Sequence, residues 1–499
     1  MIEAAQPRRS LASQLYELTR HSAIYGIGGL TSRFLAILML PLYTSYISAG
    51  DYGRIELLMA TMAVAVVLIR GGANFGFIRF YFLDPSPDYR RRLIRTVFWT
   101  QIAYSTVVVV FCVAFAQQIA VVLGITAKGQ PHLDGSGASL VIATAVLLWA
   151  NVNYAQMTNL FRAEKRSVAF SVATLANIAI TVGLTVLFVV VRHQGPLGII
   201  VGNLSGTLIV WAVLLAYRSE QLGLEWDGRL LRSMNKFGVP LMGAALAMWV
   251  TNFGDRLMLS KLLHGQYRLT ELGQYSLANK IASAMVLLFT AFQIAWPAFA
   301  YSIEDEGEAK RAYSYVLTYL LLVASWAAVA LSLFAPWLVR FLGRQPSYWP
   351  AAEAVPALAF ASVFFAGFIV VTVGAGRTKR TGFNWIAALS GAIINFGLNL
   401  YFIPHWGMLG AAWATLIAYA AIMVIRTVSA HKIYPVAYQW RRVAIVIAVA
   451  AVLAATPKAF GHSLPLAIAL TLVYPLVLAA FGFYLPAERR RLKRLLPAL

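Results

Sequence analysis

Apolar residues dominate the chain in runs of about 20, and short polar segments rich in arginine and lysine separate these runs. Each run is long enough to cross the roughly 30 Å of hydrocarbon in a bilayer as an α-helix. In lipid the backbone must satisfy its own hydrogen bonds, and the sequence lacks the alternating segments typical of a membrane β-barrel. The pattern therefore predicts an all-α polytopic membrane protein with about 14 transmembrane helices.

The loops between these runs are too short to hold a further domain. The predicted spans are 21–46, 54–78, 96–123, 138–161, 167–191, 196–217, 238–262, 272–302, 312–338, 351–376, 381–403, 407–427, 441–458 and 464–485.

The composition agrees with a membrane protein, because 60% of the 499 residues are hydrophobic and only 12% are charged. A formal net charge of +22 would suggest nucleic acid in a soluble protein. In a membrane protein, however, basic residues collect in cytoplasmic loops, so we expect no nucleic-acid partner. Cys112 is the only cysteine, which excludes an internal disulfide.

The distribution of basic residues also predicts the orientation. About 29 of the 41 lysines and arginines fall in the N-terminal segment, in every second loop and in the C-terminal tail, which predicts that these segments are cytoplasmic. Both termini are then on the same side, as an even number of spans requires. We predict a cytoplasmic N-terminal arm at 1–20 and a basic cytoplasmic tail at the other end.

The chain also shows a weak internal repeat. Ser32-Arg33-Phe34-Leu35 precedes Tyr52-Gly53-Arg54-Ile55, and Asp255-Arg256-Leu257-Met258 precedes Leu272-Gly273-Gln274-Tyr275 at a similar spacing. Repeats of this kind form the two halves of many transporters, with the binding site near the bilayer midplane. We predict an N-lobe at 21–217 (spans 1–6), a cytoplasmic linker at 218–237, a C-lobe at 238–430 (spans 7–12), and two further helices with the tail at 431–499.

Four basic residues fall inside predicted spans, where a charge costs several kcal/mol unless it faces water or a partner. They are Arg33, Arg70, Arg256 and Lys280, in the first two helices of each predicted lobe. Two acids, Glu56 and Asp255, accompany them, and we expect Asp255 to pair with the adjacent Arg256. Structural ion pairing, or a side chain that reaches the membrane surface, is the alternative for each of the four.

A cavity with surplus positive charge attracts anions, and the arginine side chain binds phosphate oxygens in a bidentate manner. The four basic residues are therefore candidate substrate-binding residues of a cationic cavity. The candidate supporting residues are Asp255, Asn252 and Glu56.

Other features of the spans favour structural roles. Gly71, Gly72 and Pro297 are candidate hinges, because glycine and proline interrupt helices. Asn395 and Asn399, and the polar cluster at 151–156, are expected to form interhelical hydrogen bonds.

The sequence contains no catalytic or nucleotide-binding motif. There is no G-x-x-x-x-G-K-[ST] phosphate loop, no H-E-x-x-H motif and no set of carboxylates at metal-ligand spacing. No loop is long enough to form a sizeable polar reaction site. We therefore expect a protein that is not an enzyme and that requires no cofactor or metal.

Several short motifs occur together in an order that is typical of one family. They are Ser48-Ala49-Gly50-Asp51-Tyr52-Gly53, Gly76-Phe77-Ile78-Arg79-Phe80-Tyr81-Phe82, Phe161-Arg162-Ala163-Glu164-Lys165, the segment from Pro240 to Asp255-Arg256, Gly273-Gln274-Tyr275-Ser276-Leu277-Ala278-Asn279-Lys280-Ile281, Ala295-Trp296-Pro297, and Ile403-Pro404 followed by Gly407 and Gly410-Ala411-Ala412. In these segments the chain resembles the Wzx-type polysaccharide flippases. They are the polysaccharide-transport branch of the multidrug/oligosaccharidyl-lipid/polysaccharide exporter superfamily.

The resemblance implies two six-helix lobes in a V shape, plus two C-terminal helices, in the plasma (inner) membrane. It implies transport of an isoprenoid-diphosphate-linked oligosaccharide from the inner to the outer leaflet by alternating access, in polysaccharide biosynthesis. The implied partners are the lipid-linked oligosaccharide, membrane lipids and glycan polymerase or assembly proteins. Lipid II flipping or multidrug export in the same superfamily stays open, and a membrane-embedded glycan ligase or polymerase is the alternative from another class.

Overall fold

The structure is a computed structural model that describes residues 34–35, 37–125, 137–219, 223–263, 265, 267–377, 383–486 and 488. Within these ranges the regular secondary structure is entirely helical, which confirms the predicted all-α class. Ten helical segments of the described chain are long and apolar enough to cross a membrane, and α17 is a shorter apolar helix. The protein is therefore a multi-pass membrane protein.

The chain forms two compact units, which we describe separately. The first contains Met1–Met39 and Thr61–Leu246, and the second contains Leu40–Ala60 and Ala247–Leu499. Of the three boundaries, those after Ala60 and Leu246 fall inside long helices, α3 (Ala49–Tyr81) and α9 (Gly228–Leu262).

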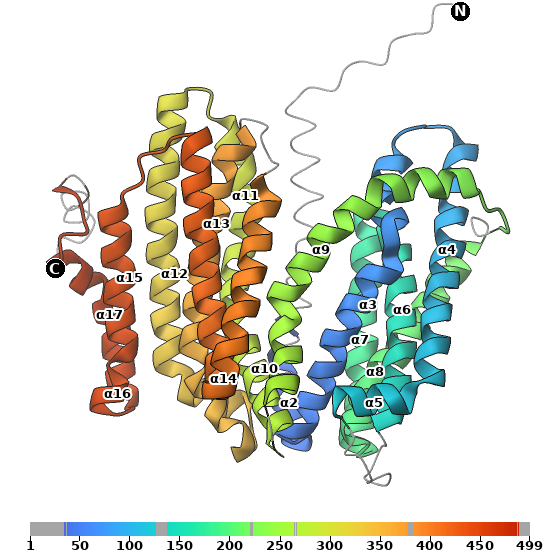
Figure 1. Cartoon of the computed structure of the whole chain (residues 1–499), viewed down its shortest axis with the longest axis horizontal. Helices are drawn as coiled ribbons and strands as arrows, with labels where there is room; N and C mark the ends of the chain where they lie inside the picture. Colours follow the sequence, from blue (N-terminus) through green and yellow to red (C-terminus); the bar gives the residue numbers. More distant parts are fainter. Residues whose placement is uncertain are drawn as a thin grey trace, which may run out of the picture. The chain divides into compact units, whose positions relative to one another are not determined.

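The first unit is a bundle built around α6 and α8 (Figure 1). Its helices are the later part of α3, α4 (Pro87–Ala114), α5 (Ala116–Leu123), α6 (Gly137–Ala163), α7 (Ser167–Val186), the π-helix η1 (Leu187–Val191), α8 (Gly195–Tyr217) and the first part of α9. Phe98, Phe161, Phe170 and Leu214 form part of its buried core.

Glycines allow close backbone contacts in the first unit. Helix α3 is interrupted at Gly71, whose φ of 55° and ψ of −175° are not helical. A Cβ atom on Gly238 of α9 would lie 1.9 Å from the carbonyl oxygen of Gly72. Because only glycine fits such an approach, these two positions allow α3 and α9 to pack backbone against backbone.

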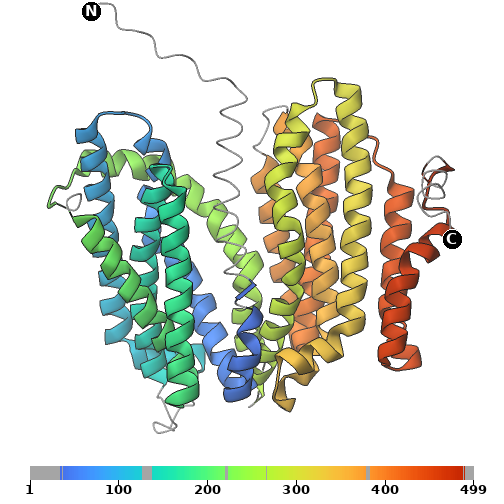
Figure 2. The ribbon, with the colours of Figure 1, turned by 180° about the vertical axis from the view of Figure 1, so that it is seen from behind.

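The second unit holds the remaining helices. They are α2 (Leu40–Tyr46), the first part of α3, the later part of α9, α10 (Arg268–Ala282), α11 (Ala284–Ser302), α12 (Glu306–Leu342), the 3-10 helix η3 (Pro346–Glu353), α13 (Val355–Arg377), α14 (Phe383–Ile433), α15 (Trp440–Ala455), α16 (Pro457–Phe460) and α17 (Leu464–Ala480). Helices α12, α13 and α14 pack around a core of alanine, valine and leucine, and α15 and α17 run side by side (Figures 1 and 2).

The predicted spans agree closely with these helices. Every span from 54–78 onward coincides with a helix or a pair of helices, whereas most of 21–46 lies outside the described residues. Helix α14 covers the predicted span 381–403 from Phe383 onward and the span 407–427, and it is broken at Gly407, where the second span begins, with φ of 53°. The Met408 amide that follows the break donates to Oε2 of Glu271 at 3.2 Å, which satisfies one of the groups left unpaired there.

Two helix boundaries differ from the predicted spans. Helix α9 begins at Gly228, within the predicted linker 218–237 and ahead of the predicted span 238–262, and Oδ1 of Asp227 accepts there from the amides of Arg229 and Leu230. The predicted span 272–302 is interrupted at Ser283, between α10 and α11, whereas Pro297 lies inside α11.

Candidate functional site

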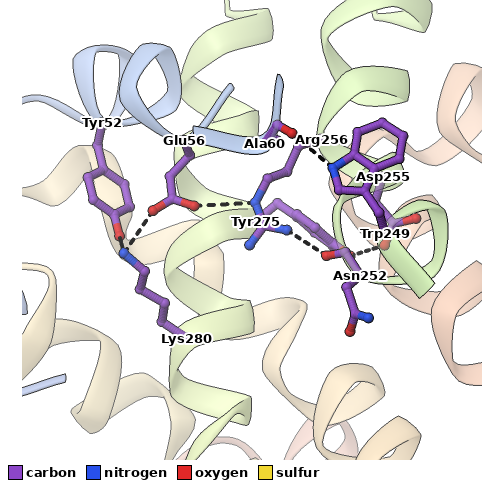
Figure 3. A network of polar contacts seen from close by, with 9 residues as sticks. All are labelled: Tyr52, Glu56, Ala60, Trp249, Asn252, Asp255, Arg256, Tyr275 and Lys280. Atoms are coloured by element: carbon purple, nitrogen blue, oxygen red, sulfur yellow. Dashed lines mark hydrogen bonds and ion pairs between the residues drawn. The ribbon is translucent and has the colours of Figure 1, made fainter. Parts of the chain in front are cut away.

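A buried carboxylate shared by two cations lies inside the second unit (Figure 3). Glu56 on α3 accepts from Lys280 on α10 at 2.7 Å and from Nε of Arg256 on α9 at 3.3 Å. Glu56 and Arg256 are 8% and 5% exposed, whereas the Lys280 side chain keeps 32% of its surface. Three helices therefore meet at one set of charges within membrane-spanning segments.

A close crossing of α3 and α10 positions Glu56 and Lys280. A Cβ on Gly53 would lie 1.9 Å from the Leu269 carbonyl oxygen, and one on Gly273 would lie 1.9 Å from that of Ala49. The two contacts are reciprocal, since each glycine meets the residue four positions before the other. Gly53 and Gly273 are also corresponding positions of the weak sequence repeat, so the contact has the local two-fold symmetry that a repeat produces.

Tyr52 completes the environment of Lys280. The Lys280 ammonium donates to the Tyr52 hydroxyl at 2.5 Å and lies 4.9 Å from the centre of its ring. Tyr348 packs edge-on against Tyr52 and donates to the carbonyl oxygens of Ile47 and Ser48 at 3.0 and 3.1 Å. Burial raises the pKa of Tyr348 well above its usual range, so its hydroxyl stays protonated and anchors the start of α3.

Asp255 does not pair with Arg256, contrary to the sequence prediction. Its carboxylate accepts from the Tyr275 hydroxyl at 2.6 Å, the Asn399 amide at 2.6 Å and the Thr415 hydroxyl at 2.9 Å. Adjacent residues on a helix point in different directions, so Asp255 and Arg256 face different neighbours. The Asn399 contact confirms an interhelical hydrogen bond from that residue.

Arg256 is held by α9 itself as well as by Glu56. Its Nη1 donates to the Asn252 carbonyl oxygen at 3.0 Å, and its guanidinium lies over the Phe253 ring. Asn252 therefore contributes its backbone carbonyl, whereas its side chain is exposed and donates to the Met248 carbonyl oxygen.

The two carboxylates of the site contact different groups. Among the described residues, Glu56 is the carboxylate that directly contacts both Arg256 and Lys280, whereas Asp255 accepts from neutral donors and acts on Arg256 only through space. Lys280 is partly exposed and can donate further hydrogen bonds. The arrangement is suited to attract an anion. Among the described residues, no group of three or more His, Cys, Asp or Glu side chains could hold a metal ion.

The amino-acid sequence matches one family model, described as polysaccharide biosynthesis protein, over residues 46–349. The chain belongs to this polysaccharide biosynthesis family. A search of curated proteins matched none of them in sequence.

Solved structures share the fold of this polysaccharide biosynthesis protein at low sequence identity. Lipid II flippase MurJ, in an inward closed conformation, is 14% identical with a TM-score of 0.74, and the match covers 93% of this chain and 99% of that one. An inward-facing multidrug resistance MATE family transporter of the MOP superfamily is 14% identical with a TM-score of 0.65, covering 81% and 97%. A MOP superfamily transporter from Pyrococcus furiosus is 14% identical with a TM-score of 0.51, covering 86% and 96%.

The structure brings together only part of the predicted cationic set of this family member. Arg256 and Lys280 share Glu56 in the second unit, with Asp255 beside them on α9. Arg70 belongs to the first unit, where its Nε is buried without a hydrogen-bond partner in the described structure. Arg33 lies outside the described residues.

Sequence reasoning missed three hydroxyl groups of the site. Tyr52, Tyr275 and Thr415 contact Lys280 or Asp255 directly. Tyr52 and Tyr275 both occur in the motifs that carry the family resemblance, and this position in the motifs is the sequence feature that could have identified them as site residues. Tyrosine and threonine are frequent in membrane helices for other reasons, so their identity alone does not distinguish them.

Proposed function

We propose that this protein is a flippase that moves an isoprenoid-diphosphate-linked oligosaccharide from the inner to the outer leaflet. Membership of a polysaccharide biosynthesis family and the fold likeness to lipid II flippase MurJ support this assignment. The protein then acts as a transporter rather than an enzyme. Its location is the plasma (inner) membrane, with both termini in the cytoplasm and with glycan polymerase or assembly proteins as partners.

The observation that carries the proposal is the shared carboxylate of Glu56. Glu56 holds Lys280 at a fixed place within the membrane-spanning helices, and the Lys280 side chain keeps 32% of its surface, so its ammonium can donate to a further anion. Lys280 is the exposed member and donates to a phosphate oxygen of the substrate. Glu56 and Tyr52 hold the Lys280 ammonium in place before the anion binds. Buried Arg256 adds a positive electrostatic potential at the site without contacting the anion.

Transport requires the site to face each side of the membrane in turn. In this proposal Gly71 and Gly72 on α3 act as hinges, because Gly71 already adopts a non-helical conformation. Pro297 in α11 is the third proposed hinge. Arg70 and Arg33 stay proposed substrate-binding residues on the sequence alone, which places them in the first two helices of the predicted N-lobe.

Lys310 provides a matched control for Lys280. Both lysine side chains are 32% exposed, both lie 4.9 Å from a tyrosine ring centre, and both pair with a glutamate. Lys310, however, lies near the start of α12, close to the polar segment that precedes the helix. The Lys310–Glu306 contact is also longer, at 4.0 Å, and its glutamate is exposed, so Lys310 controls for the loss of a lysine charge away from the candidate site.

The test is surface glycan in a host whose own copy of this gene is deleted, together with membrane protein level. Lys280→Gln should lower export at least about tenfold at normal protein level, since losing one charge-assisted hydrogen bond costs about 1.5–3 kcal/mol. Lys280→Arg should retain part of the activity, and Lys310→Gln should export normally. Normal export by a well-expressed Arg33→Ala, Lys280→Ala double variant would refute the diphosphate role.

A reconstitution experiment separates the proposal from the other activities of the superfamily. Purified protein in vesicles should move a lipid-linked glycan with an isoprenoid diphosphate between leaflets, whereas cationic drugs should not accumulate. Movement of lipid II at a higher rate than other lipid-linked glycans would assign the narrower lipid II activity. Glycan polymerisation or transfer without flipping would establish an enzyme instead.

A further inference from the structure

The first unit contains a long groove between α7 and α8, with a volume of about 730 Å³. On α7 it is lined by Ala169, Ala173 and Ala176, which recur at three- and four-residue spacing and therefore share one face of the helix. Because these side chains are small, they leave a depression below the neighbouring valines. Val172 and Val213 line the groove and are 61% exposed.

The groove ends where α7 and α8 come into backbone contact. A Cβ on Gly206 would lie 2.6–2.7 Å from Thr181, and one on Gly202 would lie 2.5–2.7 Å from Thr185. The open part runs from Ser167 to Ile180, about 20 Å along the helix axis at 1.5 Å per residue. This length exceeds half of the roughly 30 Å hydrocarbon thickness, so the groove accommodates an acyl chain of one leaflet.

The open end of the groove is basic. Lys165 and Arg166 line it, both exposed, and Nη2 of Arg166 donates to the Tyr217 hydroxyl at 2.8 Å. The nearby Glu164 carboxylate is engaged by Arg218, with Arg166 more distant at 3.9 Å. Cations therefore outnumber carboxylates at the mouth of an apolar channel.

We propose that this groove is a binding site for an anionic phospholipid. The negatively charged phosphate lies at Lys165 and Arg166, and one acyl chain lies along Ala169, Ala173 and Ala176. Basic pockets between membrane helices recognise anionic headgroups by this charge complementarity. A zwitterionic lipid instead brings its own cation toward Lys165 and Arg166, which weakens its binding. The site belongs to the first unit and does not depend on which glycan the protein transports.

The test is lipid binding to the purified full-length protein in detergent, with phosphatidylglycerol and phosphatidylcholine of identical acyl chains. Native mass spectrometry of the retained lipids measures the two affinities. We expect the wild-type protein to bind phosphatidylglycerol about tenfold or more tightly, because each basic residue near the headgroup contributes about 1 kcal/mol. Lys165→Gln/Arg166→Gln should remove most of this preference, and Lys165→Gln alone should remove part of it without disturbing the Arg166 contact to Tyr217.

Two controls isolate charge and shape. The double variant Arg91→Gln/Arg311→Gln also loses two exposed cations, but neither residue lines the groove. It should therefore keep the wild-type preference for phosphatidylglycerol. Ala176→Phe fills the groove and should reduce retention of both lipids at least several-fold, whereas Leu175→Phe on a neighbouring face should not. A melting curve for each variant confirms that it is folded.

Equal affinity of the wild-type protein for the two lipids would overturn the proposal. So would an unchanged preference in folded Lys165→Gln/Arg166→Gln protein, or an equal loss in the Arg91, Arg311 control. Equal retention by Ala176→Phe and wild-type protein would overturn the placement of the acyl chain in the groove.

Discussion

At the scale of single residues, Glu56 decides the organisation of the candidate site. It is a nearly buried carboxylate that contacts a guanidinium and an ammonium on two different helices. Removing one member of a buried ion pair leaves an uncompensated charge, which costs more than the pair contributes when intact. Glu56 is therefore expected to be essential for stability as well as for placing Lys280.

The first prediction concerns Glu56→Gln. We expect it to destabilise the protein by about 3 kcal/mol, mainly because buried Arg256 loses the carboxylate that contacts it. Thermal unfolding in detergent measures the change. Adding Arg256→Gln should recover part of the loss, so purely additive effects of the two substitutions would contradict this pairing.

The second prediction concerns Arg426 on α14. Its side chain is fully buried beside Met423 and Ala430, and all three guanidinium nitrogens lack a hydrogen-bond partner in the described structure. An unpartnered buried charge is costly, so Arg426→Met should stabilise the protein by at least about 1 kcal/mol. Exposed Arg311→Met is the control and should change the melting temperature little. A lower melting temperature for Arg426→Met would show that the guanidinium has a partner.

At the scale of elements, close helix crossings place the charged residues. Helices α3 and α10 meet at Gly53 and Gly273, and Glu56 follows one turn after the first of these glycines. A larger side chain at either position would separate the two backbones and move Glu56 away from Lys280. The geometry of the charge cluster therefore depends on residues that carry no charge.

The third prediction tests this crossing. Gly273→Ala should destabilise the protein by about 1–3 kcal/mol, because its Cβ would overlap the Ala49 carbonyl oxygen. Gly397→Ala on α14 is the control, since nothing lies within 4 Å of its Cβ position. That change should be neutral or stabilising by up to about 1 kcal/mol, because alanine favours the helix. Equal effects of the two substitutions would contradict the close contact.

At the scale of the whole molecule, the arrangement of basic loops predicts one orientation in the membrane. Lysine and arginine accumulate on one side of a multi-pass protein, and here they alternate from loop to loop along the chain. The helices from α3 to α17 correspond to the predicted spans, so the loops used for this count lie between helices of the structure.

The fourth prediction is the topology itself. Reporters that are active only outside the cytoplasm should be silent when fused at about residue 499 or at Glu225, and active at about 130 and 266. The measurement is reporter activity normalised to protein level in the membrane. Activity at Glu225 would contradict the two-lobe arrangement with a cytoplasmic connection.

The sequence alone determined the helical class, the position of nearly every helix and the presence of charges within the spans. These properties are local, because the bilayer requires runs of about 20 apolar residues and intrahelical hydrogen bonds wherever the chain crosses it. It did not determine which charges meet. Asp255 is adjacent to Arg256 in the chain, yet Tyr275, Asn399 and Thr415 occupy its carboxylate.

Only the tertiary structure decided that Glu56, 200 positions away, would pair with Arg256. Which side chains pair depends on the faces along which two helices pack. For α3 and α10, the close approach at Gly53 and Gly273 determines those faces. The same holds for the groove on α7, where small side chains and a basic end are visible in the sequence. Their common face and the opposing wall from α8 arise only when the two helices pack together.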